Sequence, residues 1–347
     1  MIQTAIVGGG PSGAYCACCL SENDIYPVIF DHTHPREKPC GGLLSPLAQK
    51  IFPFLKKLPI EHNERNRIYL IPPSGKRICV SFRKSKLLCL SRLKLDQFLV
   101  NKAVNKGAEL VKEKVIALER KRDLWKVKTS RQSYTVETLI GADGVNSLVR
   151  RSIIGPLRKV DKGICYGYFV GGLEKEDMTI RFLFHGIGYI WVFPRAGHTS
   201  LGIGFAETSR CYGLKRHLDM FIEKHYPCVK KISRWTALIP HVKDVKAFRI
   251  PLAGPNWILI GDAAGHVNPI IGEGMLYSLL DGKLAAQAVV RNNPQLFDRL
   301  WRETYGWSLF RDVRLMKWLY KRPVLEFYCK YLKFRSLIQP WQNALFR

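Results

Sequence analysis

The stretch IQTAIVGGGPSG, residues 2–13, decides the fold of this 347-residue chain. Its first six residues predict a buried strand, and the apolar run from about Ser12 to Leu20 predicts a helix. A second predicted strand, Pro27–Phe30, ends at Asp31. A strand, a glycine turn, a helix and a second strand that ends in an acidic residue form the βαβ unit that binds dinucleotides.

The glycines of this turn fit the pattern G-x-G-x-x-G. Gly8 permits the tight turn, Gly10 lets the backbone approach a pyrophosphate, and Gly13 lets the helix pack closely on the strand. The helix N-terminus then offers free N–H groups and a partial positive charge to the phosphates. We expect Asp31 to accept hydrogen bonds from the adenosine ribose hydroxyls. The turn alone does not distinguish FAD from NAD.

Two later motifs choose between these dinucleotides. The first is GADGVNSLVR, residues 141–150. The second is GDAAGH, residues 261–266, which is followed by Pro269 and by GEGM, residues 272–275. With these motifs the sequence resembles the large flavoprotein group that includes aromatic hydroxylases and geranylgeranyl reductases. The resemblance implies that the cofactor is FAD.

The same resemblance implies where the flavin end of FAD would lie. It places Asp262 at the ribityl chain. It also implies that Gly272 and Gly274 let backbone N–H groups approach the pyrimidine ring. The helix that begins near Met275 would point its positive end at N1 and O2, where a reduced flavin carries negative charge.

Further cofactor contacts follow from the resemblance. Asp143 and Gly144 are expected to bridge the two halves of the FAD domain, and Arg92 is expected near the cofactor phosphates. The candidate cofactor-binding residues are Gly8, Gly10, Ser12, Gly13, Ala14, Asp31, Cys40, Gly41, Gly42, Arg92, Val115, Asp143, Asp262, Pro269, Gly272, Gly274 and Met275.

Two segments are similar to the geranylgeranyl reductase branch of this group. They are KPCGGLLS, residues 38–45, and YIWVFPR, residues 189–195. In that branch the cysteine lies by the reacting face of the flavin. Strand alternation puts Tyr189, Trp191 and Phe193 on one face of a sheet, which suits an isoprenoid chain and also an ordinary core.

The candidate catalytic residues are Cys40, Tyr189 and Trp191. For Cys40 three roles stay open: a proton donor near the flavin, a redox-switch thiol, or a packing residue in a glycine loop. Residues 38–52 and 141–151, the short chain and the basic C-terminal helices are most similar to bacterial CbrA-like proteins, whose own substrate is poorly defined.

These observations predict an α/β protein. A Rossmann-type FAD-binding domain of the p-hydroxybenzoate-hydroxylase type would be joined by a β-sheet substrate domain and a helical C-terminal region. We expect the FAD-binding domain to comprise residues 1–66, 91–155 and 251–295, the substrate domain 67–90 and 156–250, and the basic helical region 296–347.

The formal net charge of +27 favours an anionic partner. No nucleic-acid-binding module is visible, so we expect no nucleic acid partner. Residues 291–347 contain twelve Lys/Arg against four Asp/Glu, a difference of +8, interleaved with aromatic residues. This pattern suits an anionic membrane surface, and it equally suits a helical cap with a solvated basic face.

The chain has no apolar run long enough to span a membrane, and its N-terminus predicts a strand instead of a signal peptide. We therefore expect a cytoplasmic location, peripheral on the inner face of the membrane if the basic tail binds there. The ten cysteines are expected to be reduced, and their spacing predicts no metal site.

The resemblance implies a reductase that transfers hydride from FADH2 to C=C bonds of a polyprenyl lipid. Two alternatives stay open: an FAD-dependent monooxygenase acting on an aromatic or lipid substrate, and a non-catalytic FAD-containing protein that binds a prenyl lipid or a membrane. No second nucleotide-binding turn is visible, so the reductant would be transiently bound NAD(P)H, a ferredoxin or a quinol.

Overall fold

The computed structural model describes residues 1–82, 85–205 and 213–338. The chain forms two compact units. Unit 1 consists of Met1–Arg36, Leu95–Asp161 and Pro240–Val313, whereas unit 2 consists of Glu37–Lys94, Lys162–Ile239 and the described residues from Arg314 onward. The α/β class, with a second β-sheet unit and C-terminal helices, is confirmed.

Unit 1 is built on a sheet whose strands follow the order β17-β18-β11-β1-β2-β8. The pairs β18–β11, β11–β1, β1–β2 and β2–β8 are parallel, and β9 and β10 extend the sheet from β11 as an antiparallel hairpin. Parallel strands are covered on both faces, which explains their continuous apolar runs. The strands are β1 (Ile2–Val7), β2 (Val28–Phe30), β8 (Glu109–Val111), β9 (Val115–Lys121), β10 (Leu124–Thr129), β11 (Ser133–Gly141), β17 (Ala253–Gly254) and β18 (Trp257–Leu259).

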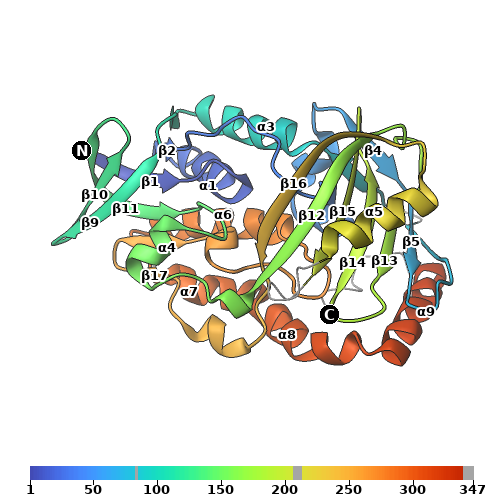
Figure 1. Ribbon diagram of the computed structural model, residues 1–347. Coiled ribbons are helices and arrows are strands. Elements are labelled where there is room, and N and C mark those ends of the chain that lie inside the picture. The colour runs from blue at the N-terminus through green and yellow to red at the C-terminus, as the bar shows by residue number, and fades with distance from the viewer. Residues whose placement is uncertain (83–84, 206–212, 339–347) are drawn as a thin grey trace. The chain divides into compact units, whose positions relative to one another are not determined.

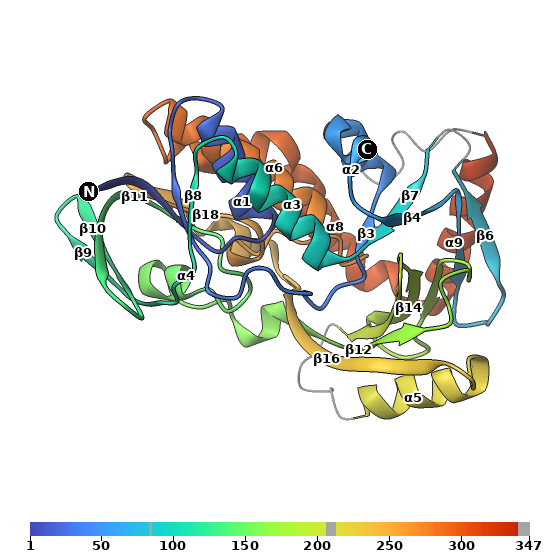
Figure 2. The same cartoon turned by 90° about the horizontal axis from the view of Figure 1, so that it is seen from above.

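Helices α1 (Pro11–Ser21) and α6 (Met275–Val290) pack side by side in unit 1, as Figure 2 shows. Gly282 makes this contact close, because a Cβ at this residue would lie 2.6 Å from the carbonyl oxygen of Ser12. Helix α1 begins just after β1, and α6 begins a short loop after β18. Both helices therefore start at the carboxyl edge of the parallel sheet, where open α/β sheets bind their ligands. The remaining helical segments of unit 1 are α4 (Leu148–Ile153), η2 (Lys159–Asp161), η4 (Val245–Arg249), η5 (Gly261–Ala263), α7 (Leu296–Trp301) and η6 (Arg302–Gly306).

Unit 2 contains a seven-stranded sheet of order β16-β12-β15-β14-β13-β5-β6 and a three-stranded sheet of order β3-β7-β4. The strands are β3 (Leu43–Leu44), β4 (His62–Arg65), β5 (Arg67–Ile71), β6 (Ile78–Ser81), β7 (Leu87–Leu90), β12 (Lys162–Gly171), β13 (Thr179–Phe182), β14 (Gly188–Pro194), β15 (Thr199–Phe205) and β16 (Lys230–Pro240). The helical segments are α2 (Pro46–Ile51), η1 (Pro53–Lys57), α5 (Leu214–His225) and α9 (Arg322–Ile338). Helices α3 (Arg92–Val104) and α8 (Trp307–Leu319) contain residues of both units.

Two cores lie on the two faces of the seven-stranded sheet. On one face Leu218 and Ile222 of α5 pack against Ile190 and Val192 of β14. On the other face Trp191 and its neighbours pack against α9. Figures 1 and 2 show α5 running along one side of the strands, with α9 beside the β6 edge. Alternate residues of β14 thus serve opposite cores, as strand geometry requires.

The unit boundaries run differently from those expected from the sequence. Residues 37–66 belong to unit 2, because β3 and β4 both pair with β7. Residues 296–313 belong to unit 1, where Phe297 and Trp301 are buried. That unit 1 binds FAD and unit 2 binds substrate stays a prediction. Trp341 and Arg347, which the sequence placed in the basic tail, lie outside the described residues.

Two glycines make room for stacked tryptophan rings on the sheet. Trp191 faces Gly202 across the β14–β15 pair, and a Cβ at Gly202 would lie 2.3 Å from the Trp191 ring. Trp235 lies over Gly167 in the same way, and a Cβ at Gly167 would lie 2.3 Å from the Trp235 ring. The two indole rings stack with centroids 5.9 Å apart.

The substitution Gly202→Ala should therefore destabilise the protein by about 1–3 kcal/mol, because the added methyl group overlaps a fully packed ring. The matched control is Gly171→Ala on β12, where the added Cβ would lie 3.8 Å from its nearest neighbour. This control should stay within about 0.5 kcal/mol of the wild type. Urea unfolding measures both values, and equal losses would contradict the packing described.

Candidate functional site

The glycine turn of residues 8–13 has the geometry expected of a phosphate-binding turn. Gly8 has φ +106°, and a Cβ there would lie 2.3 Å from the carbonyl oxygen of Ala142. A Cβ at Gly13 would lie 2.0 Å from the carbonyl oxygen of Gly8. At Gly10, in contrast, no atom lies within 4 Å of the ideal Cβ position. Added Cβ atoms would clash at Gly8 and Gly13, whereas the space at Gly10 is open, as a phosphate-binding turn requires.

The N-terminus of α1 lies at this open space. Gly10 is its N-cap residue and has no side chain to cap the helix, and Pro11 follows as the first helical residue. Ser12 and Ala14 are buried in the first turn, and the N–H of Ala14 donates to the carbonyl oxygen of Gly10 at 2.9 Å. The first turn of a helix leaves N–H donors without partners inside the helix, which makes it suitable for an anion.

Asp31 follows β2, as the sequence predicted, and its side chain binds the glycine turn. Its Oδ2 accepts a hydrogen bond from the N–H of Gly9 at 2.9 Å, and its Oδ1 accepts two from Thr33 at 2.7 and 2.9 Å. Burial alone would raise the pKa of Asp31. The hydrogen bonds and the Arg36 guanidinium have the larger, opposite effect, so the pKa lies below its ordinary value. The carboxylate is therefore ionised and fixes the position of the turn.

The GDAAGH segment and the GEGM segment meet in unit 1. Gly274 is the N-cap residue of α6, and its ideal Cβ position lies 3.7 Å from Oδ1 of Asp262. The loop between them is closed by Asn268, whose side-chain oxygen accepts from the N–H of Ile270 at 2.9 Å, while its carbonyl oxygen accepts from the N–H of Gly272 at 2.9 Å. Pro269 lies inside this loop. As in α1, no side chain caps the helix that starts at Met275.

Asp281, in the middle of α6, holds the Gly261–Asp262 turn in place. Its Oδ2 accepts from the N–H of Gly261 at 2.7 Å and contacts Nδ1 of His266 at 2.9 Å. The hydroxyl of Tyr305 binds the other oxygen of Asp281. Burial and the nearby Asp281 carboxylate raise the pKa of Tyr305, which keeps this hydroxyl protonated. Asp281 was not among the residues predicted from the sequence. Its position as an acid inside an apolar helix could have indicated a role.

Asp143 uses its side chain within its own loop. Its carboxylate accepts from the N–H groups of Leu148 at 2.6 Å and Val149 at 3.1 Å, so it caps α4. Burial outweighs these hydrogen bonds and raises the pKa of Asp143. Its main chain approaches the glycine turn of residues 8–13, because a Cβ at Gly8 would lie 3.0 Å from Cα of Asp143. Any contact with a cofactor is therefore expected from the backbone of this residue.

Other predicted residues lie at the edges of this arrangement. The buried Arg150 donates to the carbonyl oxygen of Ala263 at 3.0 Å, which joins GADGVNSLVR to GDAAGH. Ser12 lies beside the GDAAGH segment, since a Cβ at Gly261 would come within 2.7 Å of its hydroxyl oxygen. Val115 begins β9 and faces Thr129 in the hairpin.

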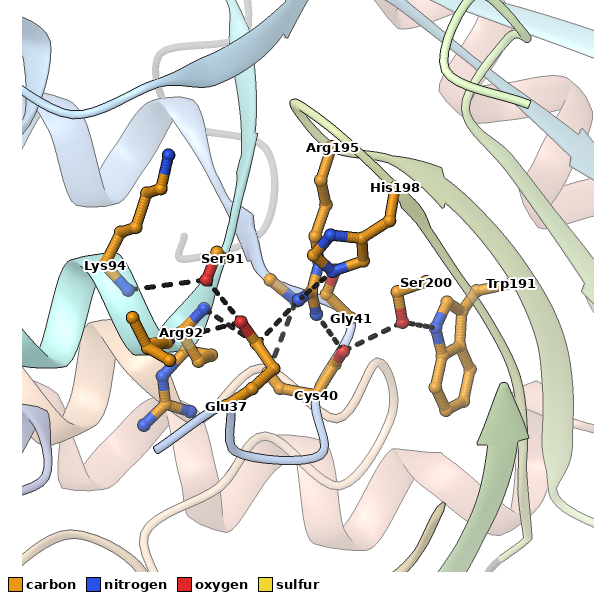
Figure 3. A network of polar contacts seen from close by, with 12 residues as sticks. Glu37, Cys40, Gly41, Ser91, Arg92, Lys94, Trp191, Arg195, His198 and Ser200 are labelled. Carbon is orange, nitrogen blue, oxygen red and sulfur yellow. Dashed lines mark hydrogen bonds and ion pairs between the residues drawn. The ribbon is translucent and has the colours of Figure 1, made fainter. Parts of the chain in front are cut away.

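In unit 2 the two segments that resemble reductases are joined by Arg195 (Figure 3). Its side chain is fully buried. The guanidinium donates to the carbonyl oxygen of Gly41 at 3.2 Å and to that of Cys40. It also forms an ion pair with Glu37, with Nη1 and Oε1 2.8 Å apart. The last residue of YIWVFPR therefore binds the backbone of the loop that contains Cys40.

Glu37 extends this network to the start of α3. Its carboxylate accepts from the N–H of Arg92 at 3.0 Å, from the N–H of Leu93 at 3.4 Å and from the hydroxyl of Ser91. Burial raises the pKa of Glu37, but Arg195 and these donors outweigh it and hold the pKa below its ordinary value. Arg92, a predicted cofactor residue, is buried and enters this network through its main chain.

The three aromatic residues of β14 lie in one row, as the alternation predicted. The ring centroids of Tyr189 and Trp191 are 6.0 Å apart, and those of Trp191 and Phe193 are 6.5 Å apart. A Cβ at Gly41 would lie 2.8 Å from the Phe193 ring, so only a glycine lets the loop pass this close. The row forms part of the hydrophobic core on that face of the sheet.

Cys40 is connected to this row by hydrogen bonds. The indole N–H of Trp191 donates to the hydroxyl oxygen of Ser200 at 3.2 Å, and that hydroxyl donates to the carbonyl oxygen of Cys40 at 2.9 Å. The Sγ of Cys40 accepts from the N–H of Gly42 at 3.3 Å, and the residue is partly exposed. Two predicted catalytic residues, Cys40 and Trp191, are thus brought together, with Tyr189 farther along the row.

Comparison with known proteins relates the chain to geranylgeranyl-reductase-type flavoproteins. It is 25% identical over 351 residues to a digeranylgeranylglycerophospholipid reductase of Methanococcus vannielii, covering 90% of this chain and 85% of the relative. It is 28% identical over 354 residues to a menaquinone reductase of Mycobacterium tuberculosis, covering 90% of this chain and 83% of the relative. No family model matches the chain.

Solved structures confirm the fold. A geranylgeranyl bacteriochlorophyll reductase-like protein from Thermoplasma acidophilum superimposes with a TM-score of 0.81 at 20% identity, over 98% of this chain and 96% of that one. A flavin-dependent brominase superimposes with a TM-score of 0.72 at 16% identity, over 96% and 93%. Among the described residues, no helix is both long and apolar enough to cross a membrane. The narrower resemblance to CbrA-like proteins stays a prediction.

The ion pair between Glu37 and Arg195 should make stability depend on pH. Because the pKa of Glu37 in the folded state lies below its ordinary 4.5, the pair stabilises the fold above that pH. The stabilisation is lost as the pH falls through the folded pKa. Glu37→Gln leaves a buried guanidinium without its counter-charge and should cost roughly 3 kcal/mol at neutral pH.

Thermal unfolding between pH 7 and about pH 3.5 measures this effect. The stability difference between wild type and Glu37→Gln should be largest at pH 7 and shrink toward the acidic limit. The control is Glu223→Gln on the exposed side of α5, which removes a carboxylate without breaking a buried pair. A difference that stayed constant over this range would contradict the assignment.

Proposed function

We propose that this protein is an FAD-dependent reductase that saturates C=C bonds of an isoprenoid lipid. The observation that carries the proposal is the buried Arg195, which binds the carbonyl oxygens of Cys40 and Gly41. The two segments that resemble geranylgeranyl reductases, far apart in the sequence, therefore form one site in unit 2. A chance resemblance in two distant segments would not be expected to bring those segments into contact.

The residues of unit 1 fit FAD. The open space above Gly10 and the N-terminus of α1 suit the pyrophosphate, and the ionised Asp31 suits the adenosine ribose. Asp262, beside the N-terminus of α6, would take the ribityl chain, and the uncapped N–H groups of α6 would face the pyrimidine ring. Gly261 and Asp262 would be kept in position by Asp281.

The chemistry of the proposed reaction is a two-electron reduction. When bound, FADH2 would supply the hydride for one alkene carbon, and the neighbouring carbon would receive a proton. We propose Cys40 as the group that delivers this proton. An unactivated alkene accepts hydride poorly, so orientation of the chain must supply much of the rate. The side chains of Trp191 and Phe193 are buried in an apolar core beside the Cys40 loop, which would keep water away from that loop.

The proposed substrate is the isoprenoid chain itself. The named relatives act on a digeranylgeranylglycerophospholipid and on menaquinone, which differ in their head groups and share a polyprenyl chain. Unit 2 offers aromatic residues in a row, and such a row suits a repeating branched hydrocarbon. The reductant would be NAD(P)H, a ferredoxin or a quinol.

An FAD-dependent monooxygenase or another oxidative flavoenzyme is the second candidate. The likeness in fold to a flavin-dependent brominase is compatible with it, because oxidative flavoenzymes and reductases share the cofactor-binding fold. The Cys40 loop and the Arg195 contact favour reduction. A third candidate is a flavoprotein that binds a prenyl lipid without turnover. Such a protein would retain FAD, and the lipid would not reoxidise its reduced flavin.

Gly10→Val should weaken FAD binding by at least about 100-fold, because a side chain there occupies the space through which the pyrophosphate approaches. No atom lies within 4 Å of the added Cβ, so the apoprotein should fold normally. Flavin fluorescence measures the Kd, and circular dichroism of the apoprotein is the control. Unchanged FAD affinity with an intact fold would contradict the assignment of this turn.

Mass spectrometry of prenyl lipids from cells with and without the protein should show a gain of two hydrogens per reduced bond. A Cys40→Ala variant that still binds FAD should lose about 100-fold or more of this activity, the usual contribution of a general acid. The control is Cys228→Ala, which changes an exposed cysteine in the same unit. A gain of oxygen in the lipids would favour the monooxygenase.

A further inference from the structure

Helix α9 (Arg322–Ile338) carries two apolar stripes on opposite sides. The inner stripe consists of Leu325, Cys329 and Leu332, which are buried in the core of the seven-stranded sheet. The outer stripe consists of Phe327, Tyr331 and Phe334, which are 70%, 41% and 61% exposed. Both stripes follow the i, i+4, i+7 spacing that aligns side chains along one side of a helix.

The outer stripe is not explained by the fold. A helix that packs on a sheet ordinarily presents polar side chains on its far side. Single exposed apolar residues are normal, but a continuous exposed row is typical of a surface that binds a partner. The rings of Phe327 and Phe334 lie mostly in solvent, so the outer stripe adds little to the stability of unit 2.

Basic residues flank the outer stripe on both sides. Lys330 and Lys333 are exposed along one flank of the helix. Arg335 lies on the other flank, with its guanidinium 5.9 Å from the centroid of the Tyr331 ring.

Residues 314–338 contain seven Lys/Arg and one acid, Glu326. The carboxylate of Glu326 is bound by the N–H and the hydroxyl of Ser74, at 2.7 and 2.8 Å.

We propose that the outer face of α9 docks on an anionic lipid surface, with the helix lying parallel to it. Phe327, Tyr331 and Phe334 would enter the boundary between head groups and acyl chains, and the flanking lysines would reach the lipid phosphates. The helix contains 17 residues and has a polar flank, which suits a position in the interface and not a span across it. This proposal does not depend on the reductase chemistry.

The charge of the surface argues for lipid over other occupants. A second copy of the chain would bring the same excess of positive charge to the contact and repel it. A polynucleotide would satisfy the lysines, but it offers no acyl layer in which three aromatic side chains on a convex helix can be buried. Anionic lipid satisfies both features at once.

The test is binding of the FAD-loaded protein to vesicles, measured by flotation. One set of vesicles contains phosphatidylglycerol and phosphatidylethanolamine, and the other contains phosphatidylcholine alone. We expect binding to the anionic set, weakened by salt. Phe327→Ser with Phe334→Ser, and separately Lys330→Gln with Lys333→Gln, should each reduce the partition coefficient about tenfold or more.

Matched controls separate this effect from general changes in surface or charge. Met220→Ser removes a side chain that is 57% exposed on α5, on the opposite side of the same sheet. Lys121→Gln with Lys128→Gln removes two charges from the β9–β10 hairpin. Both controls should bind vesicles as the wild type does, and all variants should keep the wild-type circular dichroism and FAD content.

Three results would overturn the proposal. The α9 variants could bind anionic vesicles as tightly as the wild type does. The wild type could bind neither set of vesicles. Finally, the wild type could form a dimer in solution that Phe327→Ser with Phe334→Ser dissociates, which would make a second copy the occupant. Loss of turnover with intact vesicle binding would count against the proposed reductase and not against this surface.

Discussion

The buried guanidinium of Arg195 imposes the constraint on which the proposed substrate site depends. A charge taken fully out of water is costly unless it has a counter-charge and acceptors for its N–H groups. Glu37 supplies the counter-charge, and the carbonyl oxygens of Cys40 and Gly41 supply acceptors. Because Glu37 also binds the first residues of α3, one ion pair fixes the Cys40 loop, the end of β14 and the start of a helix.

Unit 1 uses a carboxylate in a comparable way. Asp281 is buried within α6 and binds the N–H of Gly261, so the turn that contains Asp262 has a defined position relative to the helix that follows it. Asp31 does the same for the first glycine turn through the N–H of Gly9. In both cases the acid accepts from a main-chain N–H of a glycine turn, and the helix that follows has glycine at its N-cap, so no side chain caps it.

The sequence predicted those features whose physical cause is local. The roles of Gly8 and Gly13, the βαβ unit and the shared face of Tyr189, Trp191 and Phe193 depend only on neighbouring residues and on strand alternation. The partners of the site could not be found in this way. Glu37 and Arg195 stand 158 positions apart, and Trp235 reaches the aromatic row from another strand. The boundary at residue 37 was missed because it depends on β3 and β4 pairing with β7, and such short strands carry too few residues to show a pattern.

We propose that this protein reduces a prenyl double bond with a bound flavin, and that the Cys40 loop and the aromatic row of unit 2 contribute to this reaction. Anaerobic absorbance spectroscopy tests this most directly. The purified protein is reduced with dithionite in the absence of oxygen, and a polyprenyl lipid is then added. We predict that the oxidised flavin spectrum returns with one saturated bond formed per flavin. A flavin that stays reduced with the lipid, and is reoxidised only when oxygen is admitted, would contradict the claim.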